Sequence, residues 1–321
     1  MVPRKRLLIT RRLTEAVLAR IGRDYEGVLN TDDRPLTGDE IVARAEGCDG
    51  VICAPGDPLD GDVVSRLPDS VRAIATFSVG YDHLDVAAAK QRGIRAFNTP
   101  GVLTDSTADI TLLLLLGAAR RAFEGQRMLR AGQWAGWTPT QLLGRSLAGK
   151  RLGILGMGRI GNAVAHRARA FELEIHYCNR HRLGADRELG ATFHTSPREL
   201  MRGADFFSLH CPATPETHHF LDAERIDWLP DHAIVVNTAR GAVVDDAALI
   251  DALRSGRIAA AGLDVFEGEP DVHPGYRALD NVYILPHMGS ATIETRDAMG
   301  HRALDNLDAF FAGRNPPDSI E

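Results

Sequence analysis

The sequence predicts an α/β protein that contains two doubly wound parallel sheets. Three observations lead to this prediction. The chain of 321 residues is longer than one compact core of ordinary size, which suggests two domains. Short apolar runs typical of buried strands alternate with helical segments, whose apolar residues recur at three- and four-residue spacing. A glycine-rich loop, 156–161, joins one such strand directly to one such helix.

The first hundred residues carry one alternating set. Because apolar runs are followed by segments of helical spacing, we expect parallel strands with helices on both faces of the sheet. The predicted strands are 6–10, 49–54, 71–78 and 94–99, and the predicted helices are 14–25 and 39–47.

A second set follows from residue 150 onward. The run 150–156 is a near-continuous apolar strand, and apolar residues at helical spacing follow its glycine loop. The earlier run 110–119 is about half the length that spans a bilayer, so we expect a helix buried on all sides. The other predicted strands are 204–212, 232–240, 258–266 and 281–287, and the other predicted helices are 245–256 and 292–312.

Composition limits the function classes. Apolar residues make up 44% of the chain and charged residues 25%, as in ordinary globular proteins. The net charge of −6 argues against nucleic acid or an anionic membrane as the main partner. The N-terminus lacks an apolar stretch long enough for a signal peptide, so we expect a cytoplasmic protein. The cysteines show no CxxC pairing and are expected to be reduced core residues: Cys48, Cys53, Cys178 and Cys211.

The glycine loop has the spacing G-x-G-x-x-G at Gly156, Gly158 and Gly161. The pattern alone is weak, but here it follows a strand and opens a helix. Glycine at these places permits a tight turn, close backbone approach to a pyrophosphate, and close packing of helix on sheet. The sequence therefore predicts a dinucleotide site, and the alternative is a glycine-rich turn that binds nothing.

The end of the next strand departs from the usual dinucleotide pattern. About 20 residues after the loop, a carboxylate normally accepts a hydrogen bond from the ribose 2′-hydroxyl. This chain instead has Asn179, Arg180, His181 and Arg182. Because a guanidinium pairs with a phosphate through two hydrogen bonds, the arginines favour NADP(H). Asn179 could serve a ribose hydroxyl, which leaves NAD(H) open, and a solvated basic turn is the plainer alternative.

Three later strand ends carry side chains suited to one reaction. Arg240, Glu269 and His287 each follow a predicted strand, and in a doubly wound sheet such ends converge on the ligand crevice. Arginine could bind the carboxylate of a 2-oxo acid, and histidine could protonate its carbonyl oxygen as hydride arrives. A carboxylate touching the imidazole would favour its charged form. Each residue alone has a structural explanation, such as a surface ion pair, but together after a dinucleotide loop they favour catalysis.

The sequence resembles the D-isomer-specific 2-hydroxyacid dehydrogenases, whose motifs it contains in order. The resemblance covers nearly the whole chain, and within the family it is most similar to the glyoxylate/hydroxypyruvate reductases and glycerate dehydrogenases. The matching motifs are 77–85 (FSVGYDHLD), 98–109 (NTPGVLTDSTAD), 156–161 (GMGRIG), 209–217 (LHCPATPET), 237–245 (NTARGAVVD), 262–270 (GLDVFEGEP) and 285–292 (LPHMGSAT).

The resemblance implies roles for individual residues. It implies that His287 is the acid/base, that Glu269 supports it, and that Arg240 binds the substrate carboxylate. The backbone amides of Val79 and Gly80 would help to hold that carboxylate. The chain departs from the family pattern at 179–182, where the expected NADP(H) contacts rest on the residues themselves. From the resemblance, the glycine loop and this strand end together, the residues expected to line the cofactor are Thr104, Gly156, Gly158, Arg159, Ile160, Gly161, Asn179, Arg180, Arg182, Cys211, Pro212, Thr217, Thr238, Ala239, Asp264, His287 and Gly289.

The resemblance also implies a discontinuous fold. A Rossmann coenzyme domain of residues 100–288 would be inserted into a flavodoxin-like substrate domain of residues 1–99 and 289–321. Residues 120–148 would form the arm of a homodimer. The irregular stretch 128–150 overlaps this arm, holds two of the three tryptophans and must cover some surface. Trp137 would reach the partner's active site as a substrate-binding residue, and the alternative is ordinary interface packing.

The expected function is therefore NADPH-dependent reduction of glyoxylate or hydroxypyruvate to glycolate or D-glycerate by hydride transfer. One alternative is a reductase of another 2-oxo acid in the same family, and another is a non-catalytic, dinucleotide-sensing protein similar to the family's corepressors. No metal site is expected. His218 and His219 resemble a metal pair but lack a cysteine or carboxylate partner at ligand spacing in the sequence.

Overall fold

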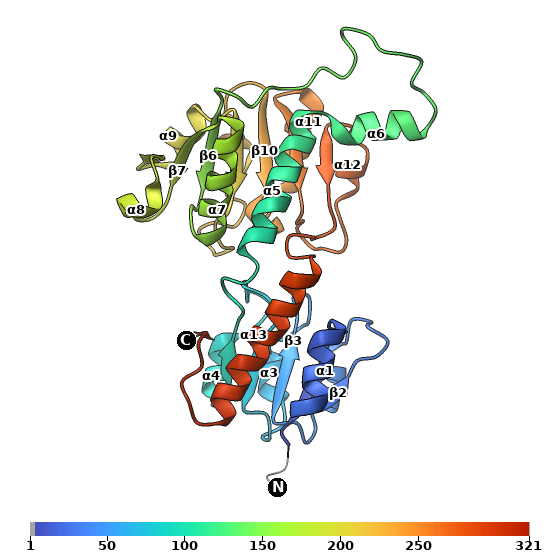
Figure 1. The fold of residues 1–321 in the computed structure, drawn as a ribbon, viewed down its shortest axis with the longest axis vertical. Helices are drawn as coiled ribbons and strands as arrows, with labels where there is room; N and C mark the ends of the chain where they lie inside the picture. The colour runs from blue at the N-terminus through green and yellow to red at the C-terminus, as the bar shows by residue number, and fades with distance from the viewer. Residues whose placement is uncertain (1–3, 321) are drawn as a thin grey trace. The chain divides into compact units, whose positions relative to one another are not determined.

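The computed structural model describes residues 4–320, which form two compact units (Figure 1). Of the described residues, unit 1 comprises 4–103 and 290–320, and unit 2 comprises Thr104–Gly289. Unit 2 is thus inserted into the chain of unit 1. Both units are α/β structures built on parallel strands, so the predicted fold class is confirmed.

Within residues 4–320, unit 1 contains a six-stranded sheet in the order β13-β5-β4-β3-β1-β2. Neighbouring strands pair in parallel except β13, which pairs antiparallel with β5. The inner strands β3 and β4 are buried at every position, as expected where helices cover both faces. The strands are β1 (Arg6–Ile9), β2 (Glu26–Leu29), β3 (Gly50–Cys53), β4 (Ala73–Thr76), β5 (Arg95–Phe97) and β13 (Ser319–Ile320).

The C-terminal helix α13 (Ile293–Phe311) packs against α1 (Glu15–Asp24) in unit 1. Gly300 lets the two helices approach closely, since a Cβ there would lie 2.3 Å from Val17 Cγ2. Arg20 of α1 forms ion pairs with Asp305 and Asp308 of α13 at 2.7 and 2.6 Å. The remaining helices of this unit are α2 (Gly38–Arg44), α3 (Gly61–Arg66) and α4 (Val86–Gln91).

Unit 2, which is described throughout, contains a seven-stranded parallel sheet in the order β12-β11-β10-β9-β6-β7-β8. The chain proceeds from β6 outward to β7 and β8, then returns to β9 and proceeds in the other direction. A ligand crevice is expected outside the carboxyl ends of the strands at this reversal. The strands are β6 (Arg151–Leu155), β7 (Glu174–Cys178), β8 (Thr192–His194), β9 (Phe206–Leu209), β10 (Ala233–Asn237), β11 (Ile258–Leu263) and β12 (Val282–Ile284).

Helices cover both faces of this sheet, and an apolar cluster fills each side. Alternate residues of β10 point to opposite clusters, Val235 to one and Ile234 and Val236 to the other. Helices α5 and α7 lie side by side (Figure 1). The helices of unit 2 are α5 (Thr104–Ala119), α6 (Ala122–Arg130), α7 (Arg159–Ala168), α8 (Ala185–Glu188), α9 (Pro197–Arg202), α10 (Ala223–Ile226), α11 (Asp246–Ser255) and α12 (Pro274–Arg277), with 3-10 turns η1 (Arg169–Phe171) and η2 (Gly241–Val243).

The apolar run predicted as a fully buried helix forms most of α5. Leu112, Leu114 and Leu115 are buried, but Leu113 is 43% exposed, so the prediction of burial on all sides is wrong at that position. Among residues 4–320, no helix has the length and apolar character needed to cross a membrane. The four cysteines are buried and free of disulfide bonds, as predicted.

Candidate active site

The glycine loop lies where the strand order reverses, between β6 and α7. Gly156 has a φ of +91°, and a Cβ there would lie 2.7 Å from the backbone nitrogen of Cys211. A Cβ on Gly161 would lie 2.8 Å from the Gly156 carbonyl oxygen, whereas Gly158 faces open space. Packing therefore requires the first and third glycines, and the second leaves room for a group at the N-terminus of α7. This geometry fits a dinucleotide pyrophosphate.

The end of β7 carries amide and guanidinium groups. The Asn179 side-chain oxygen accepts a hydrogen bond from the Met157 amide at 2.6 Å, so this residue supports the glycine loop. Arg182 forms a two-point ion pair with Glu188, with distances of 2.7 and 3.0 Å. Arg180 is exposed and forms no ion pair among residues 4–320. Of the two arginines predicted to bind phosphate, Arg182 thus already has a carboxylate partner.

The segment after β9 forms a turn around Thr217. Its hydroxyl donates to the Pro212 carbonyl at 2.6 Å and accepts from the Thr214 amide at 2.8 Å. The Thr217 hydroxyl, predicted to contact the cofactor, is therefore used by the turn itself. The pKa of Glu216 is lowered by hydrogen bonding to Thr214 and, to a smaller extent, by the charge of Arg180.

Arg240 lies in the turn after β10, and contacts that could not be predicted from the sequence fix the backbone of this turn. The Asn237 side chain accepts from the Ala239 amide at 3.0 Å and donates to the Arg240 carbonyl at 2.9 Å. A Cβ on Gly241 would lie 1.8 Å from the carbonyl carbon of Phe266, so only glycine fits there. The Arg240 turn is therefore packed directly against the loop that follows β11.

His287 and Glu269 are in contact after the ends of β12 and β11. His287 Nδ1 lies 2.5 Å from Glu269 Oε1, and Oε2 accepts from the Phe266 amide at 3.2 Å. Burial raises the pKa of Glu269, but the hydrogen bond and charge of His287, the Phe266 amide and the charge of Arg240 together outweigh burial and lower it. The His287 and Glu269 side chains remain 38% and 35% exposed, so both are accessible to a ligand.

Asp264, predicted to line the cofactor, shapes the histidine loop. It is 1% exposed, and its carboxylate oxygens accept hydrogen bonds from the Met288 and Gly289 amides at 2.6 and 2.7 Å. Burial raises the pKa of Asp264, and these two amides oppose the rise. The His287 amide donates to the Asp264 carbonyl at 2.8 Å. These bonds hold His287 in a left-handed conformation, with φ of +52°, that is uncommon for residues other than glycine.

Other predicted cofactor residues lie at the same carboxyl ends or at helix starts in unit 2. Arg159 and Ile160 begin α7, and Thr104 begins α5. The Thr238 hydroxyl lies 2.9 Å from the Thr111 hydroxyl of α5. Burial raises the pKa of the Cys211 thiol to about 11, so this side chain offers a neutral, apolar surface.

Val79 and Gly80 belong to unit 1, in the loop that follows β4. The Val79 carbonyl accepts from the Asn98 side chain at 2.8 Å, and the Gly80 carbonyl accepts from the Ser78 hydroxyl at 2.6 Å. Ser78 Oγ in turn lies 2.7 Å from Thr76 Oγ1. The carbonyl groups of this predicted substrate-binding loop are thus held in place by neighbouring polar side chains.

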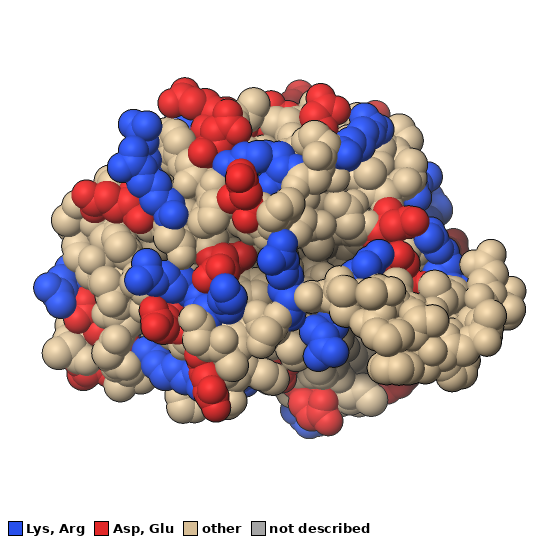
Figure 2. All heavy atoms as spheres, turned by 90° about the horizontal axis from the view of Figure 1, so that it is seen from above, with Lys and Arg blue, Asp and Glu red and all other residues tan. Residues whose placement is uncertain are grey.

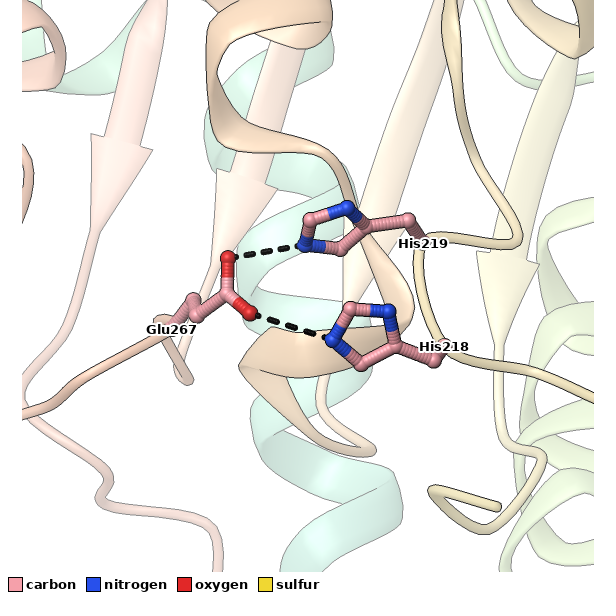
Figure 3. A group of neighbouring side chains, drawn as sticks. All are labelled: His218, His219 and Glu267. Atoms are coloured by element: carbon pink, nitrogen blue, oxygen red, sulfur yellow. Dashed lines mark hydrogen bonds and ion pairs between the residues drawn. The ribbon is translucent and has the colours of Figure 1, made fainter. Parts of the chain in front are cut away.

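The structure also brings together residues that are distant in the sequence. Glu267 lies 2.9 Å from His219 and 3.5 Å from His218 (Figure 3). The sequence has no carboxylate at ligand spacing from this histidine pair, but the fold brings one to it. The partner follows His219 by 48 positions, a separation that motifs of short ligand spacing do not cover.

Comparison of the sequence with known proteins identifies its family. Residues 112–289 match the family described as D-isomer specific 2-hydroxyacid dehydrogenase, NAD binding domain. Glycerate dehydrogenase from Hyphomicrobium methylovorum is 44% identical over 312 residues, which make up 97% of each chain. Glyoxylate reductase from Korarchaeum cryptofilum (strain OPF8) is 42% identical over 319 residues, covering 98% of this chain and 95% of that one.

Solved structures are similar over nearly the full chain. A D-isomer specific 2-hydroxyacid dehydrogenase, NAD-binding, from Polaromonas sp. JS6 66 has a TM-score of 0.95 at 45% identity, covering 99% of this chain and 100% of that one. An NADPH-dependent glyoxylate/hydroxypyruvate reductase from Sinorhizobium meliloti, in complex with NADP and malonate, has a TM-score of 0.89 at 34% identity, covering 99% and 97%. The chain therefore belongs to the D-isomer-specific 2-hydroxyacid dehydrogenases, enzymes that use a nicotinamide dinucleotide to act on small acids.

Proposed function

We propose that this enzyme reduces glyoxylate or hydroxypyruvate with NADPH, giving glycolate or D-glycerate. The reaction type is supported chiefly by the contact of His287 with Glu269. The charge of Arg240 also acts on this pair, since it helps to lower the pKa of Glu269. Reduction of a 2-oxo acid needs a proton donor for the carbonyl oxygen and a fixed positive charge for the carboxylate. The proposed role of Val79 and Gly80, donation of their amides to that carboxylate, rests on the motif match at 77–85.

His287, Glu269 and Arg240 have different roles in the proposed reaction. The nicotinamide cofactor, when bound, supplies the hydride. Because Nδ1 of His287 faces Glu269, Nε2 is the atom that can give a proton to the substrate oxygen. Glu269 keeps the imidazole oriented and balances its positive charge. Arg240 pairs with the substrate carboxylate through the planar guanidinium, which fixes the direction of the reacting carbonyl.

The proposed preference for NADPH rests on the end of β7. A carboxylate that would repel a 2′-phosphate is absent there, and the Asn179 oxygen is already bonded to the glycine loop. Arg182 is partly neutralised by Glu188, so we assign the 2′-phosphate mainly to the exposed Arg180, with NAD(H) as the second cofactor. The relative from Sinorhizobium meliloti is described as NADPH-dependent, which supports this assignment.

The substrate assignment is supported by the relatives named glycerate dehydrogenase, glyoxylate reductase and glyoxylate/hydroxypyruvate reductase. The test is a panel of 2-oxo acids, from glyoxylate to phenylpyruvate and a branched oxo acid, with NADPH or NADH and purified protein. We expect the highest kcat/KM with glyoxylate or hydroxypyruvate. A higher kcat/KM with a bulkier acid would favour the alternative that this enzyme reduces another 2-oxo acid. No turnover with any acid would favour a non-catalytic dinucleotide sensor.

We also propose that residues 120–148 form the arm of a homodimer. Trp137 is 77% exposed, and Leu129, Trp134 and Leu143 are exposed as well. Residues 131–143 contain no charged side chain, and Figure 2 shows an uncharged projection at its right, where Figure 1 places α6 and the segment after it. Positive and negative side chains are interspersed over the rest of that face. A second copy of the chain would remove this apolar surface from water.

A further inference from the structure

A second cluster of ligand-type side chains is distinct from the Glu269 and His287 pair. It consists of His218 and His219, from the turn between β9 and α10, and of Glu267, from the loop after β11. His219 Nε2 lies 2.9 Å from one carboxylate oxygen, and His218 Nε2 lies 3.5 Å from the other. Figure 3 shows both rings presenting a nitrogen to the same carboxylate. The proposed reduction uses none of these three side chains.

We propose that His218, His219 and Glu267 bind a divalent transition-metal ion, with Zn²⁺ preferred over Mg²⁺ and Ca²⁺. Two imidazoles and one carboxylate are typical ligands of zinc, whereas magnesium and calcium select oxygen ligands. The three ligand atoms all lie within 4.8 Å of one another. Zinc bonds of about 2.0–2.1 Å in tetrahedral geometry place ligand atoms about 3.4 Å apart, so small side-chain movements suffice.

The surroundings of the cluster allow these movements. The His218 side chain is 56% exposed, while His219 and Glu267 are 37% and 39% exposed. The two rings are stacked, with centroids 4.0 Å apart and an angle of 26° between planes. A shared ion requires His218, the more exposed ring, to rotate toward the carboxylate. Water would fill the remaining coordination positions, as in open zinc sites.

An ion at this cluster would restrain two segments that present candidate catalytic residues. The His219 amide donates to the Ala242 carbonyl at 2.8 Å, in the segment directly after Arg240. Glu267 lies on the same short loop as Glu269. Because the three ligands come together only in the folded chain, Zn²⁺ should stabilise the fold and raise its thermal midpoint.

The test is titration of the full-length protein with Zn²⁺ by calorimetry, with Co²⁺ absorption as a probe of coordination. We expect a site in the wild type that His218→Gln weakens more than about tenfold, since loss of even outer-shell partners of a metal costs about 10–100-fold. His166→Gln, which removes an exposed histidine of α7, is the matched control and should bind as the wild type does. Zn²⁺ should raise the Tm of the wild type and control more than that of His218→Gln.

A third variant separates this site from the candidate catalytic pair, which also offers an imidazole and a carboxylate. Zn²⁺ binding that survives His287→Gln and is weakened in both His218→Gln and Glu267→Gln supports the proposal. Equal binding by the wild type and His218→Gln overturns it, and so does a wild-type protein that binds no Zn²⁺. Because His218 is largely exposed, its replacement should leave folding and metal-free turnover unchanged, which circular dichroism and kinetics can check.

Discussion

His287 is held from two directions, by the Glu269 carboxylate at Nδ1 and by the backbone of Asp264 at its amide. Glutamine at position 287 would keep hydrogen-bonding groups but could not donate a proton as an imidazolium does. We therefore predict that His287→Gln lowers kcat with glyoxylate by about 10²–10⁴-fold, the usual contribution of a general acid. NADPH affinity should change much less than kcat, although His287 is also expected to line the cofactor site. Steady-state kinetics and fluorescence titration with NADPH measure the two quantities.

His166→Gln serves as the control for this prediction, because His166 is an exposed histidine of α7 outside the candidate site. Its turnover should match that of the wild type. If His287→Gln folds normally and also turns over at the wild-type rate, the proton must come from another group, and the assigned role is wrong.

Glu269 should make stability depend on pH in the acidic range. Its pKa in the folded protein is lowered from the ordinary value of 4.5, so folding favours the ionised carboxylate. The resulting stabilisation is fully present above the unfolded pKa and is lost as pH falls through the lower folded value. Urea unfolding of the wild type and Glu269→Gln should show a constant difference in the free energy of unfolding above about pH 5, which shrinks below about pH 4. If the difference in the free energy of unfolding instead grows as the pH falls, the predicted direction of the Glu269 effect is wrong.

At the scale of elements, the close approach of α7 to its sheet depends on a missing side chain. A Cβ on Gly161 would lie 2.8 Å from the Gly156 carbonyl and 3.1 Å from Ile154 Cγ2. We predict that Gly161→Ala lowers the free energy of unfolding by about 1–3 kcal/mol and raises the KM for NADPH, because α7 must move away from the loop. Thermal or urea unfolding and cofactor kinetics test the two effects.

Gly22 in α1 provides the matched control, since a Cβ there would meet no atom within 4 Å. Alanine is the better helix former, so Gly22→Ala should leave cofactor kinetics unchanged and raise the free energy of unfolding by up to about 1 kcal/mol. We therefore expect the free energy of unfolding to fall in Gly161→Ala and to rise in Gly22→Ala. Destabilisation of the same size at both positions would indicate that packing at Gly161 is unimportant.

The sequence predicted the buried strands well because burial on both faces leaves a continuous apolar run. The predicted strands 49–54 and 232–240 contain β3 and β10, in which every residue is buried. The helix predicted to stop at Gly256 does so, in a left-handed conformation with φ of +75°. By contrast, β2 has the sequence EGVL at a sheet edge and is mostly exposed, so it carries no apolar signal and was not predicted.

Residue types at strand ends could be predicted, whereas their partners could not. Arg240, Glu269 and His287 follow strands that any doubly wound sheet brings to one edge. The pairing of Arg182 with Glu188 depends on how the short helix α8 is placed. The approach of Glu267 to the His218–His219 turn depends on the packing of two loops. Such contacts arise from the tertiary arrangement of loops, for which periodicity and spacing in one sequence carry no information.

At the scale of the whole molecule, the exposed apolar side chains of residues 120–148 predict a dimer. We expect a solution mass of twice 34.9 kDa by light scattering. Combined replacement Trp134→Ser and Leu143→Ser should shift the protein toward the monomer, because both side chains would leave an apolar interface. Leu189→Ser, at an exposed leucine outside the arm, is the control and should remain dimeric. A wild-type protein that is monomeric would contradict the proposed arm.

Trp137 allows a separate test of the arm. If this side chain reaches the partner's active site, Trp137→Ala should raise the KM for the oxo acid while the dimer persists. If it serves only interface packing, the mass should fall and the KM should change only with dissociation. Light scattering and kinetics at the same protein concentration distinguish the two results.

Cofactor selection by the whole enzyme is the central claim of the proposed function, and one ratio measures it. This ratio is kcat/KM with NADPH divided by kcat/KM with NADH, at saturating glyoxylate, for the wild type and Arg180→Asp. We predict a ratio above one in the wild type and a decrease of at least about tenfold in the variant, since a charge-assisted hydrogen bond contributes about 1.5–3 kcal/mol. A wild-type ratio at or below one, or an equal loss with both cofactors in Arg180→Asp, would contradict the account.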